Sequence, residues 1–499
     1  GAAHMADGYA RATGRVGVAM ATSGPGACNL VTGLATTYMD SIPMVAITGQ
    51  VKTHLVGTDA FQEADLTGIT LPITKHSYLV KEPAEVARFA DILREAFYLA
   101  RSGRPGPVLV DIPFDISAGQ VPWTERDLSA LDGYEDPSLP DEAEIERAAE
   151  MIAAAERPVL MIGGGIVHSG ASDEVRELAE RCSLPVVHTL MAKGCFPESH
   201  ALSLGMPGMH GAACASWALH RADLIVAVAC RFDDRITGDL SRFAPEAAIV
   251  HIDIDPAEIG KVREAAVGIA SDAKPALRAL IDATAPRGRD GWHAQLDGYR
   301  EAHPLRYADE GELPAPQAVV EALHEVTRGE AIIATDVGQH QMFAAHYYPL
   351  ERPRRWLTSG GLGTMGYGLP AAIGAQIARP DELVIGISGD GSIQMCMQEL
   401  TTAAVQRLPV KVFVLNNGYL GMVRQWQELF YDRRYSGVTL TGNPDFPRLA
   451  EAHGATGLRC AGRAELRETI ERALETDGPV LVDVPVAAEE NVYPFIPAG

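Results

Sequence analysis

The chain of 499 residues carries 65 Asp and Glu against 42 Lys and Arg, which gives a formal net charge of −23 at pH 7. This negative balance argues against nucleic acid and membranes as general partners. The length predicts about three domains, and a composition of 47% hydrophobic and 21% charged residues excludes a disordered chain.

Neither the cysteines nor the apolar runs point to a secreted or membrane protein. The 7 cysteines are scattered and form no C-x-x-C pair, which argues against a zinc ribbon and a disulfide framework. No apolar run approaches the ~18 residues of a membrane span, and no signal peptide is recognisable. We therefore predict a cytoplasmic protein. The chain opens at Gly1 in helix-like sequence with no capping residue in front, so we expect it to start within a domain.

Two stretches rich in charge, proline and glycine divide the chain, at 124–141 and 285–316. In the blocks between them, short unbroken apolar runs alternate with longer helical patterns, as in βαβ units with buried parallel strands. The clearest predicted strands are 16–21, 108–112, 159–162, 224–229, 249–254, 332–334, 383–387 and 410–415. We predict an α/β protein of three doubly wound parallel-sheet domains, at 1–125, 140–285 and 313–499.

The middle block carries a possible nucleotide signal. A glycine run at 163–165 directly follows one predicted strand, and Asp253 lies near the end of another. Glycines at a strand end let the backbone approach a pyrophosphate, and an acidic group at a neighbouring strand end can accept from ribose or adenine donors. A bare glycine run also fits an ordinary turn.

The third block contains a sharper pattern. The loop SGDGS at 388–392 follows one predicted strand, and Asn416 and Asn417 follow the next. The glycines and the helix start offer backbone N–H groups to a diphosphate, while Asp390 and Asn417 supply the hard oxygen ligands that Mg²⁺ prefers. Each motif alone would usually be a turn. Together, directly after two strands, they predict a magnesium–diphosphate site.

With 24 residues between GDG and NN, this arrangement resembles the thiamine-diphosphate enzymes. The resemblance covers nearly the whole chain and is nearest to the catalytic subunits of acetohydroxyacid (acetolactate) synthases. RFDDR together with GMVRQW indicates this subgroup, because generic thiamine enzymes share the cofactor loops without them. The matching stretches are GAAHMADGYARATG (1–14), TSGPG (22–26), GTDAFQEAD (57–65), GRPGPVLVDIP (103–113), GMHG (208–211), RFDDR (231–235), DVGQH (336–340), TSGGLGTMG (358–366) and LGMVRQWQE (420–428).

The resemblance implies thiamine diphosphate and Mg²⁺ as cofactors. The metal ligands would be Asp390, Asn417 and the carbonyl of Tyr419, and Met365 would support the bent thiamine, although a methionine is otherwise a core filler. The residues that match thiamine-diphosphate contacts are Pro25, Asn29, Val337, Gly338, Gln339, His340, Gly363, Met365, Gly389, Asp390, Gly391, Ser392, Asn417, Tyr419, Leu420, Gly421 and Met422.

The resemblance also implies a largely structural FAD in the middle domain, because carboligation needs no net redox change. The matching contact positions are Arg104, Gly163, Gly164, Thr189, Leu190, Met209, His210, Arg231, Asp234, Asp253 and Ile254.

Five residues match catalytic or substrate positions. Arg235 would bind the acceptor carboxylate, although an ion pair with a neighbouring aspartate explains a DDR tripeptide equally well. Trp426 would form the pocket wall that favours 2-ketobutyrate, or simply be core. Gln62 and Lys75 match channel residues from the first domain, where a turn and a solvated surface are the plain alternatives. Met422 matches a residue of the same active site.

The implied function is acetolactate synthase: pyruvate is decarboxylated on thiamine diphosphate, and the hydroxyethyl unit is condensed with pyruvate or 2-ketobutyrate. This is the first common step of branched-chain amino acid biosynthesis. The resemblance further implies a homodimer or tetramer and a small regulatory subunit.

The sequence departs from the pattern at its start, because the family's H-E-Q tripeptide, whose Glu activates the thiamine, would precede Gly1. We therefore expect little activity from the chain as written. Phe114 and Ser271 replace a usual Lys and Gly. Two alternatives stay open: an FAD-linked, pyruvate oxidase-like enzyme, and a non-catalytic homologue.

Overall fold

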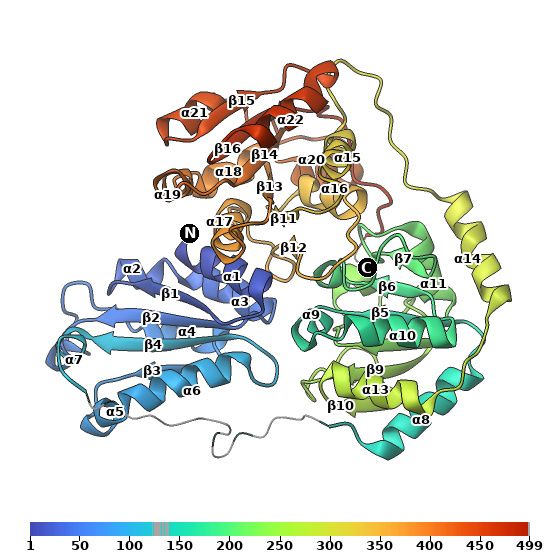
Figure 1. The fold of residues 1–499 in the computed structure, drawn as a ribbon, viewed down its shortest axis with the longest axis horizontal. Helices are drawn as coiled ribbons and strands as arrows, with labels where there is room; N and C mark the ends of the chain where they lie inside the picture. Colours follow the sequence, from blue (N-terminus) through green and yellow to red (C-terminus); the bar gives the residue numbers. More distant parts are fainter. Residues whose placement is uncertain (122, 124–130, 132–133, 135–138, 498–499) are drawn as a thin grey trace.

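The computed structural model describes residues 1–121, 123, 131, 134 and 139–497, so most of the predicted first divider and residues 498–499 lie outside the described part. Figure 1 shows three lobes, and each is built on its own sheet. Every strand pair in the three sheets is parallel. The predicted fold class is confirmed, whereas the predicted domain boundaries remain predictions.

The first lobe holds a four-stranded sheet in the order β1-β2-β4-β3. Its strands are β1 (Gly17–Ala21), β2 (Met44–Gln50), β3 (His76–Leu79) and β4 (Pro107–Pro113). Its helices are α1 (Ala2–Thr13), α2 (Pro25–Cys28), α3 (Val31–Met39), α4 (Leu66–Thr70), α5 (Pro83–Ala87), α6 (Phe89–Arg101) and α7 (Phe114–Ser117), with 3₁₀ turns at Thr53–Leu55 and Leu71–Ile73.

The second lobe holds a six-stranded sheet in the order β10-β9-β8-β5-β6-β7. This is a doubly wound order, and its direction reverses between β5 and β8. The strands are β5 (Pro158–Ile162), β6 (Val186–His188), β7 (Ser203–Gly205), β8 (Leu224–Val228), β9 (Ala248–Asp253) and β10 (Val267–Ala270). The helices are α8 (Glu142–Ala154), α9 (Gly165–Ser169), α10 (Ser172–Cys182), α11 (Ala213–Arg221), α12 (Asp234–Thr237), α13 (Ala273–Ala283) and α14 (Asp290–Ala302), with a 3₁₀ turn at Leu190–Ala192.

Helix α14 lies inside the stretch 285–316 that the sequence predicts to be a divider. Its Trp292 and Leu296 are buried in the core of the second lobe, and the Trp292 indole donates to the carbonyl of Pro158 at 3.1 Å. These two buried side chains anchor a charged segment to the lobe.

The third lobe holds a six-stranded sheet in the order β12-β11-β13-β14-β16-β15, which reverses between β11 and β13. The strands are β11 (Ile332–Thr335), β12 (Trp356–Leu357), β13 (Val384–Gly389), β14 (Lys411–Asn416), β15 (Thr456–Arg459) and β16 (Val480–Pro485). The helices are α15 (Pro316–Thr327), α16 (Gln339–Tyr347), α17 (Gly368–Ala378), α18 (Asp390–Cys396), α19 (Glu399–Val405), α20 (Gly421–Phe430), α21 (Phe446–Ala452) and α22 (Leu466–Glu475), with a 3₁₀ turn at Arg463–Glu465.

The first and third lobes meet where α1 packs on α17 (Figure 1). Glycines set this contact: a Cβ on Gly8 would overlap the carbonyl of Ala371, and one on Gly374 would overlap the carbonyl of Met5. The two backbones therefore touch with no side chain between them, as small residues allow.

None of the described helices is both long and apolar enough to cross a membrane.

The α1–α17 contact makes a stability prediction. Gly374→Ala places a methyl group against backbone, so we expect the free energy of unfolding to fall by about 1–3 kcal/mol, as overpacked cores do. The matched control is Gly298→Ala in α14, where a Cβ meets nothing within 4 Å; a better helix former there should stabilise the protein by up to ~1 kcal/mol. Denaturant unfolding measures the free energy of unfolding of both variants. Equal changes in this free energy would contradict the prediction.

Candidate active site

Asp390 lies where β13 ends and α18 begins, next to the place where the strand order of the third sheet reverses. The residue is 1% exposed. Its Oδ2 accepts from the backbone N–H of Gly418 at 3.1 Å and from Nδ2 of Asn443 at 2.7 Å. Burial raises the pKa of this carboxyl to about 6. A divalent cation beside the carboxylate would favour its charged form, so the residue suits a metal ligand.

Asn417 follows β14, the strand paired with β13. Its Oδ1 accepts from the N–H of Tyr419 at 2.9 Å, and its Nδ2 lies 3.4 Å from Oε1 of Gln339. Across the described residues no group of three or more His, Cys, Asp and Glu could hold a metal ion. A magnesium site here must therefore combine one carboxylate with amide and carbonyl oxygens, which leaves positions for phosphate oxygens and water.

A cavity of about 100 Å³ lies at these strand ends. Its glycines keep it open: a Cβ on Gly389 would lie 2.8 Å from Nδ1 of His340, and one on Gly391 would lie 2.8 Å from Cδ2 of Leu420. The predicted contacts that line it are Val337, Gly338, Gln339, His340, Met365, Gly389, Asp390, Gly391, Ser392, Asn417, Tyr419, Leu420, Gly421 and Met422.

His340 offers this cavity an unused polar atom. Its Nε2 is buried and finds no hydrogen-bond partner in the described part of the chain. Burial lowers the pKa of His340 to about 3, so its ring is neutral at physiological pH. An orphaned imidazole nitrogen, glycine loops without room for a Cβ and a helix N-terminus together fit a diphosphate.

A larger cavity of about 690 Å³ is lined by all three lobes, within the usual size range of ligand sites. The predicted FAD contacts that line it are Arg104, Gly164, Thr189, Leu190, Met209, His210, Arg231, Asp253 and Ile254. It lies at the ends of β5 and β8, between which the strand order of the second sheet reverses. Open α/β sheets bind nucleotides at such a place. The chemistry of these residues fits a dinucleotide.

Two predicted FAD positions lie elsewhere. A Cβ on Gly163 would overlap the carbonyl of Ala229, so this glycine lets two strand ends approach each other rather than lining the cavity. The side chain of Asp234 is 67% exposed and lies 3.8 Å from Nε of Arg235, while the neighbouring Asp233 lines the cavity.

Arg104 joins the first lobe to the second at one wall of the larger cavity. Its Nη1 lies 3.0 Å from Oε1 of Glu258 and 3.4 Å from Oδ2 of Asp255. Asp253 is nearby on β9, and burial raises its pKa to about 6.

Arg235 and Trp426 both line the larger cavity. The guanidinium of Arg235 is about half exposed, with Nη1 3.4 Å from Sδ of Met209, so it is available to an anion. The Trp426 ring packs edge-on against Phe430 and Phe495, and its Nε1 is buried without a hydrogen-bond partner in the described structure.

The two cavities share the lining residues Val337, Gly338, Met365 and Met422. A ligand held by its diphosphate in the smaller cavity can therefore reach past Met365 into the larger one. Gly363 lines the larger cavity beside it.

Of the predicted residues of the first lobe, Arg104 lines the larger cavity, whereas the other four line neither cavity. Pro25 and Asn29 are exposed. Gln62 has a φ of 60°. Its carbonyl oxygen approaches Gly24 so closely that a Cβ on Gly24 would lie 2.6 Å from it. Lys75 donates from Nζ to the carbonyls of Leu99 and Ser102 at 2.5 and 2.6 Å, at the end of α6. The roles assigned to these four residues stay predictions.

Asn443 is a site residue that sequence reasoning missed. It donates to Asp390 at 2.7 Å and accepts from Gln394 at 3.0 Å. Its only sequence signal is a polar side chain in a loop 53 positions beyond Asp390, and this pattern is too common to single it out.

Comparisons with known proteins agree with the arrangement of lobes. Three family models match the chain: "Thiamine pyrophosphate enzyme, N-terminal TPP binding domain" over residues 1–69, "Thiamine pyrophosphate enzyme, central domain" over 145–280, and "Thiamine pyrophosphate enzyme, C-terminal TPP binding domain" over 336–484.

Curated relatives match this chain over nearly its whole length. An acetolactate synthase of Mycobacterium bovis is 52% identical over 100% of this chain and 82% of the relative. The acetolactate synthase large subunit of Corynebacterium glutamicum is 49% identical over 100% and 81%. The acetolactate synthase isozyme 3 large subunit of Escherichia coli is 47% identical over 99% and 88%.

The metal site makes a binding prediction. Asp390→Asn keeps the side chain's size but removes its charge, so we expect Mg²⁺-dependent affinity for thiamine diphosphate to fall more than about 100-fold. Asn443→Ala removes the hydrogen bond that holds Asp390 in place, so we expect a loss of about 10-fold in the same affinity. Asp445→Asn, at the exposed start of α21, is the control and should bind as the parent does. Calorimetry with and without Mg²⁺ measures this. Parental affinity in Asp390→Asn would remove that residue from the metal site.

Proposed function

This chain belongs to the thiamine pyrophosphate enzymes, among the acetolactate synthase large subunits, and on that premise we propose that it forms acetolactate from pyruvate. One pyruvate loses CO₂, and its two-carbon unit is transferred to a second 2-keto acid, the first common step towards the branched-chain amino acids. The observation that carries the proposal is the junction of the two cavities at Val337, Gly338, Met365 and Met422.

Thiamine diphosphate supplies the electron sink for decarboxylation when it is bound, and the protein supplies orientation and acceptor choice. Asp390, Asn417 and Tyr419 would hold the Mg²⁺–diphosphate end, and Met365 would lie between that end and the larger cavity. Because Arg235 and Trp426 line the larger cavity, the second keto acid would meet them there, on that cavity's side of the junction.

Arg235 is proposed to bind the carboxylate of the second keto acid, because a guanidinium pairs with a carboxylate through two parallel hydrogen bonds. Trp426 is proposed to form the apolar wall against the acceptor's alkyl group, and so to favour 2-ketobutyrate over pyruvate. Its packing against Phe430 and Phe495 would fix the ring in place.

FAD is proposed as a second cofactor, held in the larger cavity by the lining residues of the second lobe. The FAD-linked oxidase and the non-catalytic alternatives are less well supported, because the relatives described above are acetolactate synthases at 47–52% identity.

Assembly is proposed as a homodimer, or as a tetramer made of two such dimers, in the cytoplasm. Pro25 and Asn29 are exposed, as is Phe61 at 89%, and none of the three lines the diphosphate cavity of its own chain. A two-fold pairing would bring this face of the first lobe to the third lobe of a partner. Because relatives are named large subunits, we also propose a small regulatory subunit.

The role of Arg235 can be tested by how the enzyme partitions its products. In the active enzyme, Arg235→Ala should lower acetolactate formation by about 10–100-fold, since a charge-assisted bidentate contact is lost. Decarboxylation should fall much less, so acetaldehyde should accumulate. Arg242→Ala, in the same lobe but outside the cavity lining, is the control. Equal losses of CO₂ release and acetolactate would refute the assignment.

Shared active sites can be tested by mixing inactive subunits. Asn29→Arg should block a partner's site, and Asp390→Asn should disable the subunit's own site. If each site joins two subunits, a purified heterodimer of the two variants keeps one intact site and regains about half the parental activity. If each site lies within one chain, the Asn29→Arg homodimer should already be active, because Asn29 lines neither cavity of its own chain. A heterodimer of two differently tagged Asp390→Asn subunits is the control and should be inactive.

A further inference from the structure

The loop 358–366 connects β12 to α17 and forms one wall of the larger cavity. Among the described residues, hydrogen bonds from its own lobe hold the loop near its two ends, at Thr358 and Ser359 and at Gly366. Gly366 donates to Oδ1 of Asp336 at 2.7 Å, and the N–H of Thr364 donates to the hydroxyl of Ser359 at 3.0 Å. The loop residues that line the cavity are Ser359, Gly360, Gly361, Gly363 and Met365.

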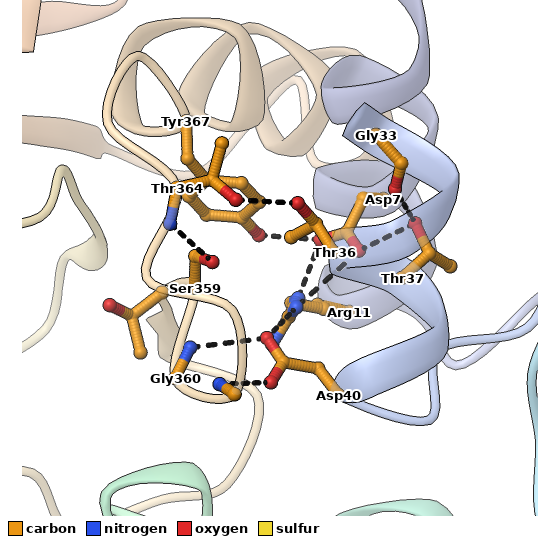
Figure 2. Close-up of polar contacts among 12 residues, drawn as sticks. Asp7, Arg11, Gly33, Thr36, Thr37, Asp40, Ser359, Gly360, Thr364 and Tyr367 are labelled. Carbon is orange, nitrogen blue, oxygen red and sulfur yellow. Dashed lines mark hydrogen bonds and ion pairs between the residues drawn. The ribbon is translucent and has the colours of Figure 1, made fainter. Parts of the chain in front are cut away.

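The middle of this loop is held by the first lobe instead (Figure 2). Asp40, the C-cap residue of α3, accepts from the N–H of Gly361 at 2.6 Å and from the N–H of Gly360 at 3.2 Å. One turn earlier on α3, the hydroxyl of Thr36 lies 2.7 Å from that of Thr364. Three contacts from one helix end therefore fix the loop across the lobe boundary.

Asp40 is itself held by a buried arginine. Nη2 of Arg11 lies 2.8 Å from Oδ2 of Asp40, and Nε lies 2.6 Å from Oδ1 of Asp7. The side chains of Arg11, Asp40 and Asp7 are 5%, 1% and 0% exposed. The hydroxyl of Tyr367, next to the loop, donates to Oδ1 of Asp7 at 2.5 Å.

The charges of this cluster favour the position in which the loop contacts Asp40. One guanidinium cannot neutralise two buried carboxylates, so Asp40 needs further donors once water is excluded. The N–H groups of Gly360 and Gly361 are those donors, and neither residue has a side chain that could block the approach. A Cβ on Gly361 would lie 2.9 Å from Oδ1 of Asp40. If the loop moved away, a buried carboxylate would lose two hydrogen bonds, which is costly in a medium of low polarity.

We propose that Asp40 and Thr36, with Arg11 behind them, are positioning residues of the active site. They fix the loop 358–366 from the neighbouring lobe and thereby set the place of Met365 at the junction of the two cavities. The proposal rests on the proposed function for one point, that the ligand supported by Met365 is thiamine diphosphate. The position of the loop does not depend on which ligand is bound.

The test compares Asp40→Asn and Thr36→Val with Arg379→Met. Arg379 also joins the lobes, donating to the carbonyl of Ala12 at 3.0 Å, but it lies outside the loop. In the cofactor-free protein we expect amide exchange of the peptide covering 359–366 to speed up by about tenfold in Asp40→Asn and less in Thr36→Val. In Arg379→Met it should stay within about twofold of the parent.

The second readout is the Kd for thiamine diphosphate in Mg²⁺, which should rise in the same order while the exchange of β13 and β14 stays parental. Unchanged loop exchange in folded Asp40→Asn overturns the proposal. Should that variant fail to fold, unchanged exchange in Thr36→Val overturns it. If the parent binds no thiamine diphosphate, the proposed function fails, and the exchange data still decide the positioning role.

Discussion

The burial of Arg11 between Asp7 and Asp40 is the interaction on which the relation of the first and third lobes depends. Removing one partner from a buried ion pair typically costs about 3–5 kcal/mol because the other charge is left uncompensated. Here the compensation comes from both lobes, since Tyr367 and the loop N–H groups complete the shell around Asp7 and Asp40. The glycine contact between α1 and α17 brings the two lobes close enough for these bonds.

Sheet topology explains why the cofactor loops fall where they do. In the second and third sheets the order reverses between β5 and β8 and between β11 and β13. At each reversal the following helices leave on opposite faces, so the strand ends are left uncovered. The glycine run after β5 and the loop after β13 occupy these two places, and the two cavities form there.

Sequence reasoning succeeds where the signal is local. The buried strands and the loop of Asp390 are encoded by apolar runs and turn residues within a few positions, so β13 and β14 begin and end within about two residues of their predicted ranges. It fails for long-range contacts. Arg11 and Asp40, or Asp40 and Gly361, are joined only by the fold, since 29 and 321 positions separate them. The helix α14 was missed because two apolar anchors in a charged segment give no clear periodicity.

Helix α3 has a mechanical consequence for an assembly of two subunits. Its nine residues make a rod about 14 Å long, with the exposed Asn29 just before its first turn and Asp40 at its end. In the dimer proposed above, one end of this rod faces the partner's cofactor while the other props the loop of its own chain. A rigid rod cannot tilt at one end alone, so ligand binding in one subunit would be felt in the other, and the two sites would not titrate independently.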